Sequence, residues 1–305
     1  MPSLKAIRKR ITSVKSTQKI TRAMKMVAGA RLNRAQQRIL ALRPYAQKTA
    51  AVLADVAHDV IVAESEADHT PDHKVDLPHP LLARRQEKKV LFVVLSSDRG
   101  LCGGFNANVN KAVEREWRAK RAANVEVVFA SIGKKGREYI TRRGGEILID
   151  FQKIYDGLSL EKADEVAAFL IPRFEDGEFD AIYLVYNEFV SAMTQAIQFR
   201  LLLPLPQPEA ASAAEAMPPA KFIYEPDPEA LLERLVPMYV GITLYRALLD
   251  SQASEYGARM TAMDAATRNA KDMISRLTLV YNRARQAAIT KELMEIIGGA
   301  EALKE

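Results

Sequence analysis

The first 54 residues of the chain contain 13 lysines and arginines but no acidic residue, because the first carboxylate belongs to Asp55. The same segment carries apolar residues at alternating spacings of three and four, which is typical of a helix that packs along another helix. After residue 54 the balance reverses to 31 basic and 38 acidic residues. Charge blocks of one sign are usually interaction surfaces, so the segment predicts a long cationic helix that lies against a partner.

The N-terminal pattern begins at Leu4, and its interruptions cluster at three neighbouring polar positions. The interrupting residues are Gln18, Thr21 and Lys25, beside which the apolar stripe moves to Ile20, Met24 and Val27. We interpret this shift of the apolar stripe as a change of phase, in which the apolar face moves around the helix. A second partner or a turn of the contacting face would cause such a change. Pro44 lies inside the pattern and predicts a kink, because its ring displaces the carbonyl one turn back.

The C-terminal end repeats the pattern from Leu235 to Lys291, with no proline after Pro237. A helix from Pro228 to Leu303 would measure roughly 110 Å at about 1.5 Å per residue. Both seams contain several alanines, which allow two helices to approach closely. We therefore expect the two terminal helices to pair as an antiparallel coiled coil.

Between the helices, short runs rich in Val, Ile, Phe and Tyr alternate with helical stretches, which indicates βαβ units and a largely parallel sheet. The predicted strands are Lys89–Ser96, Val125–Ile132, Ile147–Phe151 and Ala181–Phe189, with Gln198–Leu205 as a possible fifth. The predicted helices are Asn108–Arg121, Lys134–Arg142 and Leu160–Phe174. We divide the chain into a helix at 1–60, a polar linker at 61–88, the α/β domain at 89–205, a Pro/Ala-rich connection at 206–227 and a helix at 228–305.

No credible catalytic, cofactor or metal site emerges from the sequence. The glycine-rich turn at 96–106 follows a strand, but its spacing is neither the dinucleotide fingerprint nor the P-loop, and we interpret it as a tight connection. His69 and His73 have helical metal-ligand spacing, yet Pro71 opposes a helix there and a solvated linker is the preferred interpretation. Cys102, the single cysteine, excludes an intramolecular disulfide and has no evident His partner. A nucleotide-dependent enzyme is the third hypothesis for the chain, and it predicts saturable nucleotide binding.

The cationic helix leaves other interaction classes open. A nucleic-acid-binding coiled coil is the main alternative, although the helix has no aromatic residue before Tyr45 to stack on bases. A helix on a membrane surface and a merely solvated cationic face are further alternatives. No apolar run approaches the ~18 residues that a membrane span needs. The acid-free N-terminus imitates a transit peptide, but the heptad continues too far, and we interpret it as a mature helix.

Three segments resemble the signatures of one family, the gamma subunit of the rotary F-type ATP synthase. They lie in the family's order and span nearly the whole chain. The segments are 19–28 (KITRAMKMVA), 97–106 (SDRGLCGGFN) and 281–293 (YNRARQAAITKEL), the last followed by Glu295 and Gly298-Gly299-Ala300.

The resemblance implies an antiparallel coiled coil of the two terminal helices with an inserted Rossmann-like α/β domain. It implies a non-catalytic central rotor shaft, one copy per complex, that transmits proton-driven rotation of the c-ring to three alpha and three beta subunits. The epsilon subunit and the c-ring are the implied partners at the base, with no nucleic acid and no cofactor. The implied location is peripheral, on the cytoplasmic face of a bacterial inner membrane.

The resemblance also implies roles for particular residues. Those near the beta subunit are Met24, Lys25, Arg285 and Gln286. The C-terminal bearing, which the surrounding subunits sheathe, includes Leu293, Ile296, Ile297 and Leu303. The foot that meets the c-ring and the epsilon subunit includes Phe222, Tyr224 and Glu225. Gly257 departs from the family by standing where a better helix former is usual, and we expect a flexible point there. The regulatory cysteine insert of chloroplast forms is absent, so redox control of that kind is not expected.

Overall fold

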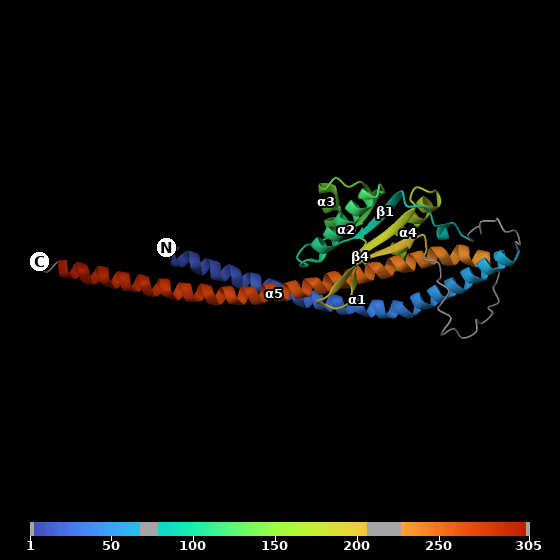
Figure 1. Ribbon diagram of the computed structural model, residues 1–305. Coiled ribbons are helices and arrows are strands. Elements are labelled where there is room, and N and C mark those ends of the chain that lie inside the picture. The colour runs from blue at the N-terminus through green and yellow to red at the C-terminus, as the bar shows by residue number, and fades with distance from the viewer. Residues whose placement is uncertain (1–2, 68–78, 206–226, 303–305) are drawn as a thin grey trace. The chain divides into compact units, whose positions relative to one another are not determined.

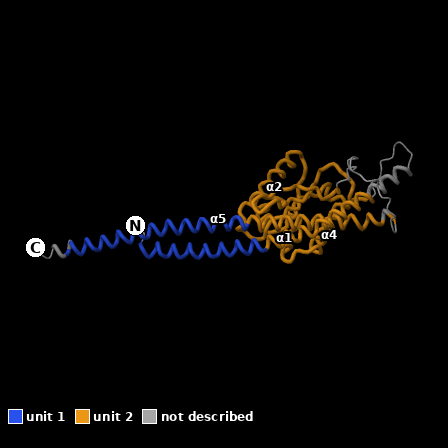
Figure 2. The backbone as a smooth tube through the Cα atoms, turned by 90° about the horizontal axis from the view of Figure 1, so that it is seen from below, with its two compact units in different colours: residues 1–30, 259–305 blue, residues 31–258 orange. Residues whose placement is uncertain are grey.

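The structure, a computed structural model of the chain, describes residues 3–67, 79–205 and 227–302. Two compact units divide these residues. One unit combines the two ends of the chain, residues 1–30 and 259–305, and the other contains residues 31–258 (Figure 2).

Two long helices begin and end the chain. Helix α1 extends over Leu4–Ala67 and helix α5 over Pro228–Ala302. Helix α1 continues through Pro44 and past residue 60, where the sequence analysis ended it, and α5 continues through Pro237. Each unit contains one segment of α1 and one segment of α5, and within each unit the two segments lie side by side (Figure 1).

The residue 31–258 unit is built around a five-stranded sheet with the order β3-β2-β1-β4-β5. The first four strands are parallel, and β5, which lies at one edge of the sheet, is antiparallel to β4. The strands are β1 (Lys89–Leu95), β2 (Glu126–Ile132), β3 (Ile147–Phe151), β4 (Ala181–Phe189) and β5 (Gln195–Leu203). The predicted α/β fold between two long helices is therefore confirmed.

Helices cover both faces of the sheet (Figure 1). On one face, Val90, Phe92 and Val94 of β1 pack with α2 (Phe105–Ala122) and α3 (Lys134–Arg142). On the other face, the alternate residues of β1 share a core with α4 (Leu160–Glu175), α5 and part of α1, beside the short 3-10 helix η1 (Pro80–Leu82). Because both faces are buried, β1 reads as a continuous apolar run, as parallel strands usually do.

Helix α5 lies over the carboxyl ends of β1 and β4, where the strand order reverses. Ser254 Oγ donates a hydrogen bond to the Asn187 carbonyl at 3.0 Å, and Ala258 is buried with Cys102 and Phe105. A Cβ atom on Gly257 would lie 3.1 Å from the Cα of Ala192. Open α/β sheets commonly bind ligands at the carboxyl ends of the strands where the strand order reverses. In this chain α5 packs against that place. Gly257 therefore allows close packing in a continuous helix, which differs from the flexible point that the sequence suggested.

Candidate functional surfaces of the terminal helices

Hydrogen bonds connect the glycine-rich turn after β1 to the start of α2 and to the start of α3. Ser96 Oγ donates to the Gly133 carbonyl at 3.0 Å and accepts from the Gly136 N–H at 2.8 Å. The Ser97 N–H donates to Asn106 Oδ1 at 3.0 Å. The Lys134 N–H donates to Asp98 Oδ1 at 3.1 Å. These hydrogen bonds hold the turn between β1 and α2 in place, in agreement with the tight connection that the sequence predicted.

Of the four histidines of the chain, the side chain of His79 is described. His79 is buried, and its Nδ1 accepts the Leu81 N–H at 3.1 Å, which caps η1. Burial lowers the pKa of His79 below its usual value. The side chains of His58, His69 and His73 lie outside the described residues, and within the described part of the chain no group of three metal-ligating side chains gathers.

The residue 1–30 and 259–305 unit is an antiparallel pair of helices with a partly polar seam. Lys25 Nζ lies 2.5 Å from Asp264 Oδ1, and Thr267 Oγ1 donates to Thr21 Oγ1 at 2.8 Å. The predicted antiparallel pairing is confirmed within this unit. The predicted change of phase is wrong, because the polar residues of α1 stay in the seam and pair with polar residues of α5.

The two predicted contact residues of α1, Met24 and Lys25, have different surroundings. Lys25 is half-exposed and engaged by Asp264, and its hydrogen bond lowers the pKa of that carboxyl. Met24 beside it is half-buried. A second apolar group faces away from the seam and is exposed, and it consists of Ile20, Met26 and Val27. Ile20 and Val27 of the apolar stripe noticed in the sequence therefore belong to an outer face of the helix, whereas Met24 does not.

Helix α5 extends beyond its partner within the same unit (Figure 2). The register of Lys25 against Asp264 places Leu4, where α1 begins, opposite roughly Arg285. Arg285 and Gln286 are both exposed. Past them the helix carries a row of exposed apolar side chains, which are Ile289, Leu293, Met294, Ile296 and Ile297. An apolar row of this kind is typical of a surface that a partner covers.

Several predicted residues lie outside the described part of the chain. They are Leu303 of the bearing and Phe222, Tyr224 and Glu225 of the foot. Conversely, Asp264 and Thr267 were not predicted from the sequence. The signal that could have found them was present, since a polar seam residue on one helix needs a polar partner on the other.

Helix α5 carries a buried carboxyl group, that of Asp250. Asp250 is 5% exposed, and its Oδ2 lies 3.9 Å from Arg246 Nε one turn earlier. Glu188 of β4 and Arg200 of β5 also act on it electrostatically. Burial raises the pKa of Asp250 to about 6, because desolvation outweighs the two arginines.

Comparison with known proteins decides the family. The family described as ATP synthase matches residues 3–303. The ATP synthase gamma chain of Sorangium cellulosum is 57% identical over the full length of both chains, and that of Anaeromyxobacter sp. strain Fw109-5 is 49% identical, also over the full length of both. The chain belongs to the ATP synthase gamma chain family. Its predicted role as the non-catalytic rotor subunit of an F-type ATP synthase is thereby confirmed.

Solved structures support the fold of this gamma chain. The rotor of the Euglena gracilis mitochondrial ATP synthase matches with a TM-score of 0.60 at 18% identity, over 94% of this chain and 98% of that one. The central stalk of the Tetrahymena thermophila enzyme matches with a TM-score of 0.56 at 24% identity, over 81% and 99%. The nucleic-acid-binding alternative finds no support in these comparisons. A gamma chain is part of a membrane-associated complex, and no described helix is long and apolar enough to cross a membrane.

Proposed function

We propose that the gamma chain turns, as one copy per complex, inside a ring of three alpha and three beta subunits, with the c-ring and the epsilon subunit at its base. The observation that carries the proposal is the end of α5, which extends past α1 and exposes a row of apolar side chains. Such a row needs a covering surface in water, and a sheath formed by the ring subunits supplies one. Leu293, Ile296, Ile297 and Leu303 then form the bearing.

We further propose that four residues contact the beta subunits as the shaft turns. Arg285 and Gln286 are exposed where α5 loses its partner helix, so their side chains are free to meet another subunit. A guanidinium group can bind a carboxylate through two parallel hydrogen bonds. Met24 and Lys25 lie beside the exposed face formed by Ile20, Met26 and Val27, and Lys25 keeps Asp264 as its partner within the shaft.

The proposal also covers the contact with the c-ring and the location of the complex. Phe222, Tyr224 and Glu225 are proposed to meet the c-ring and the epsilon subunit, on the grounds of the family resemblance. The complex is proposed to lie at the cytoplasmic face of a bacterial inner membrane, and its proton flow turns the c-ring. The packing of α5 over the carboxyl ends of β1 and β4 supports a mechanical role for the sheet domain over nucleotide binding.

Replacing Arg285 or Gln286 by alanine is expected to reduce ATP synthesis while leaving assembly largely intact. Both side chains are exposed, so their loss removes a grip on the beta subunit without removing packing within the chain. The loss of one charge-assisted hydrogen-bonded contact corresponds to about tenfold in a rate or an equilibrium. The measurement is ATP synthesis against proton uptake in inverted membrane vesicles, with subunit content checked on gels.

Arg283→Ala is the matched control, since Arg283 is also exposed on α5 and carries the same charge. We expect this variant to retain normal coupling. Normal coupling in Arg285→Ala and Gln286→Ala as well would refute the proposed grip.

A further inference from the structure

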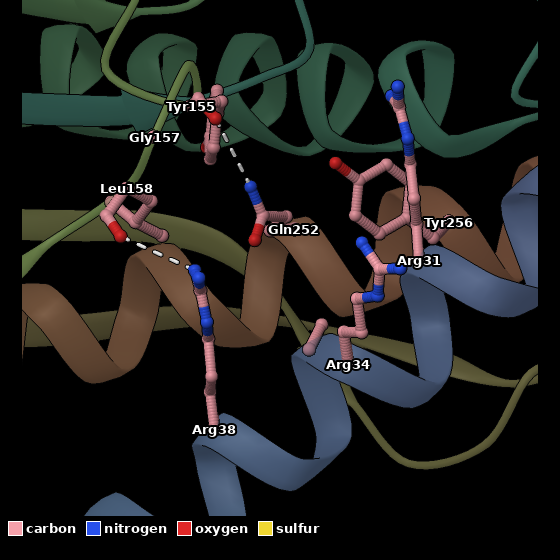
Figure 3. Close-up of a pocket in the computed structure, with 9 residues that line it drawn as sticks. Arg31, Arg34, Arg38, Tyr155, Gly157, Leu158, Gln252 and Tyr256 are labelled. Atoms are coloured by element: carbon pink, nitrogen blue, oxygen red, sulfur yellow. Dashed lines mark hydrogen bonds between the residues drawn. The ribbon is translucent and has the colours of Figure 1, made fainter.

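A cationic pocket lies within the residue 31–258 unit. Arg31, Arg34 and Arg38 project from α1 at spacings of three and four, which places them on one face of the helix. They line a pocket of about 180 Å³ together with Tyr155 and Gln252, among others (Figure 3). None of its lining residues is acidic.

The acceptors at the base of this pocket are already paired. Gln252 Nε2 donates to the Tyr155 carbonyl at 3.4 Å, and Arg38 Nη1 donates to the Leu158 carbonyl at 3.4 Å (Figure 3). The Tyr155 hydroxyl donates to Ser251 Oγ at 3.2 Å. The pocket therefore presents an excess of donors, because its carbonyl oxygens are engaged and its guanidinium groups have further N–H groups to offer.

The three arginines lack opposite charges of their own. In the described part of the chain, no ion pair involves Arg31, Arg34 or Arg38, and Arg31 lies over the Tyr256 ring with its Cζ 5.9 Å from the ring centroid. Glu255 acts electrostatically on Tyr155, but it is buried and does not line the pocket. Three neighbouring cations repel one another unless an anion lies between them.

We propose that this pocket binds a polyphosphate group, either free or as the tail of a nucleotide. A single carboxylate would neutralise one of the three guanidinium groups, whereas a diphosphate or triphosphate carries enough charge for all of them. Arginine also matches tetrahedral oxyanions because its planar fork donates two hydrogen bonds at once. The pocket is smaller than the roughly 300–1,000 Å³ of sites that enclose a drug-sized ligand, so a nucleotide's base would remain outside.

Site-resolved arginine labelling of the purified ATP synthase complex tests the proposal. Phenylglyoxal reacts with free guanidinium groups, and mass spectrometry of peptides reports Arg34 separately from arginines at the catalytic sites. The probe is inorganic tripolyphosphate at low salt, with EDTA present to stop turnover. We expect tripolyphosphate to slow labelling of Arg34 severalfold and to leave the rate at Arg43 unchanged.

Two variants make the test specific. Arg38→Gln removes one cation of the pocket, and we expect the tripolyphosphate concentration for half-protection of Arg34 to rise about tenfold, as for one lost charge-assisted contact. Arg43→Gln makes the same change of charge on an exposed residue of α1 that does not line the pocket, and should leave that concentration unchanged.

The remaining outcomes identify the ligand or overturn the site. Equal protection by ATP and tripolyphosphate supports recognition of the phosphate chain alone, and better protection by ATP identifies a nucleotide as its source. If phenylglyoxal does not label Arg34 even when no polyphosphate is added, the proposal is overturned. That result would indicate that an acidic segment of a partner subunit covers the pocket. Equal protection of Arg34 and Arg43 would also overturn it, since that indicates diffuse attraction to a cationic helix.

Discussion

Replacing Gly133 by alanine is expected to destabilise the residue 31–258 unit by about 3 kcal/mol or more, from backbone strain plus overpacking. Gly133 precedes α3 with φ 100° and ψ 143°, a conformation that is open essentially to glycine alone. A Cβ atom there would lie 2.2 Å from the backbone oxygen of Ser96. The Ser96 backbone cannot move away from the added Cβ without a large cost in free energy, because Ser96 is fully buried at the end of β1.

The natural probe for this experiment is Trp117, the single tryptophan of the chain. Its ring centroid lies 5.1 Å from that of Phe129 on β2, so its fluorescence reports the same unit during urea unfolding. The matched control is Gly144→Ala, because Gly144 has φ 74° but no atom within 4 Å of an added Cβ. We expect that control to cost about 1 kcal/mol, the usual penalty for a left-handed non-glycine residue. Equal losses in both variants would contradict the role given to the Ser96 contact.

Replacing Asp250 by asparagine is expected to stabilise the chain at pH 8, by about 2–3 kcal/mol from the shift in its pKa. The folded pKa of about 6 lies above the ordinary value of 3.8. Between these two values the folded state holds a proton that the unfolded state has released, so stability falls as pH rises through this window. Asparagine never ionises, and it therefore avoids the cost of a buried carboxylate.

The measurement is the free energy of unfolding of wild type and Asp250→Asn from pH 4 to pH 8. The two stabilities should converge near pH 4, where the carboxyl is protonated in the folded state. Asp264→Asn is the contrasting control. Lys25 lowers the pKa of Asp264, so wild type should gain over this variant as pH rises through the ordinary range of a carboxyl. A difference between wild type and Asp250→Asn that is the same at every pH would refute the account of Asp250.

The terminal helices were predictable because their apolar spacing extends over many turns, and such long patterns are the most reliable signal that a sequence carries. The strands were predictable for a related reason. Strand β1, for example, is buried on both faces and therefore contains only apolar residues between Val90 and Leu95. The family signatures added the order of the parts and their function.

The missed features depend on contacts between segments that are distant in the sequence. Thr21 and Lys25 looked like interruptions because their partners, Thr267 and Asp264, lie more than two hundred residues away. Gly257 looked like a weak point in a helix, and only the fold shows the close approach of Ala192. The pocket formed by Arg31, Arg34 and Arg38 was hidden for a similar reason, because its other wall comes from the segment around Tyr155 and from α5.

Rotation of the chain within the assembled complex tests the central claim most directly. Cys102 is 2% exposed and is the single cysteine of the chain, so a new exposed cysteine can be labelled selectively within this chain. Arg115 on the outer face of α2 is exposed and suits the substitution Arg115→Cys. With the alpha and beta subunits fixed to a surface and a bead attached at this position, the account predicts that ATP drives unidirectional, stepwise rotation of the bead. A bead that stays still while the same complexes hydrolyse ATP would contradict the rotor function.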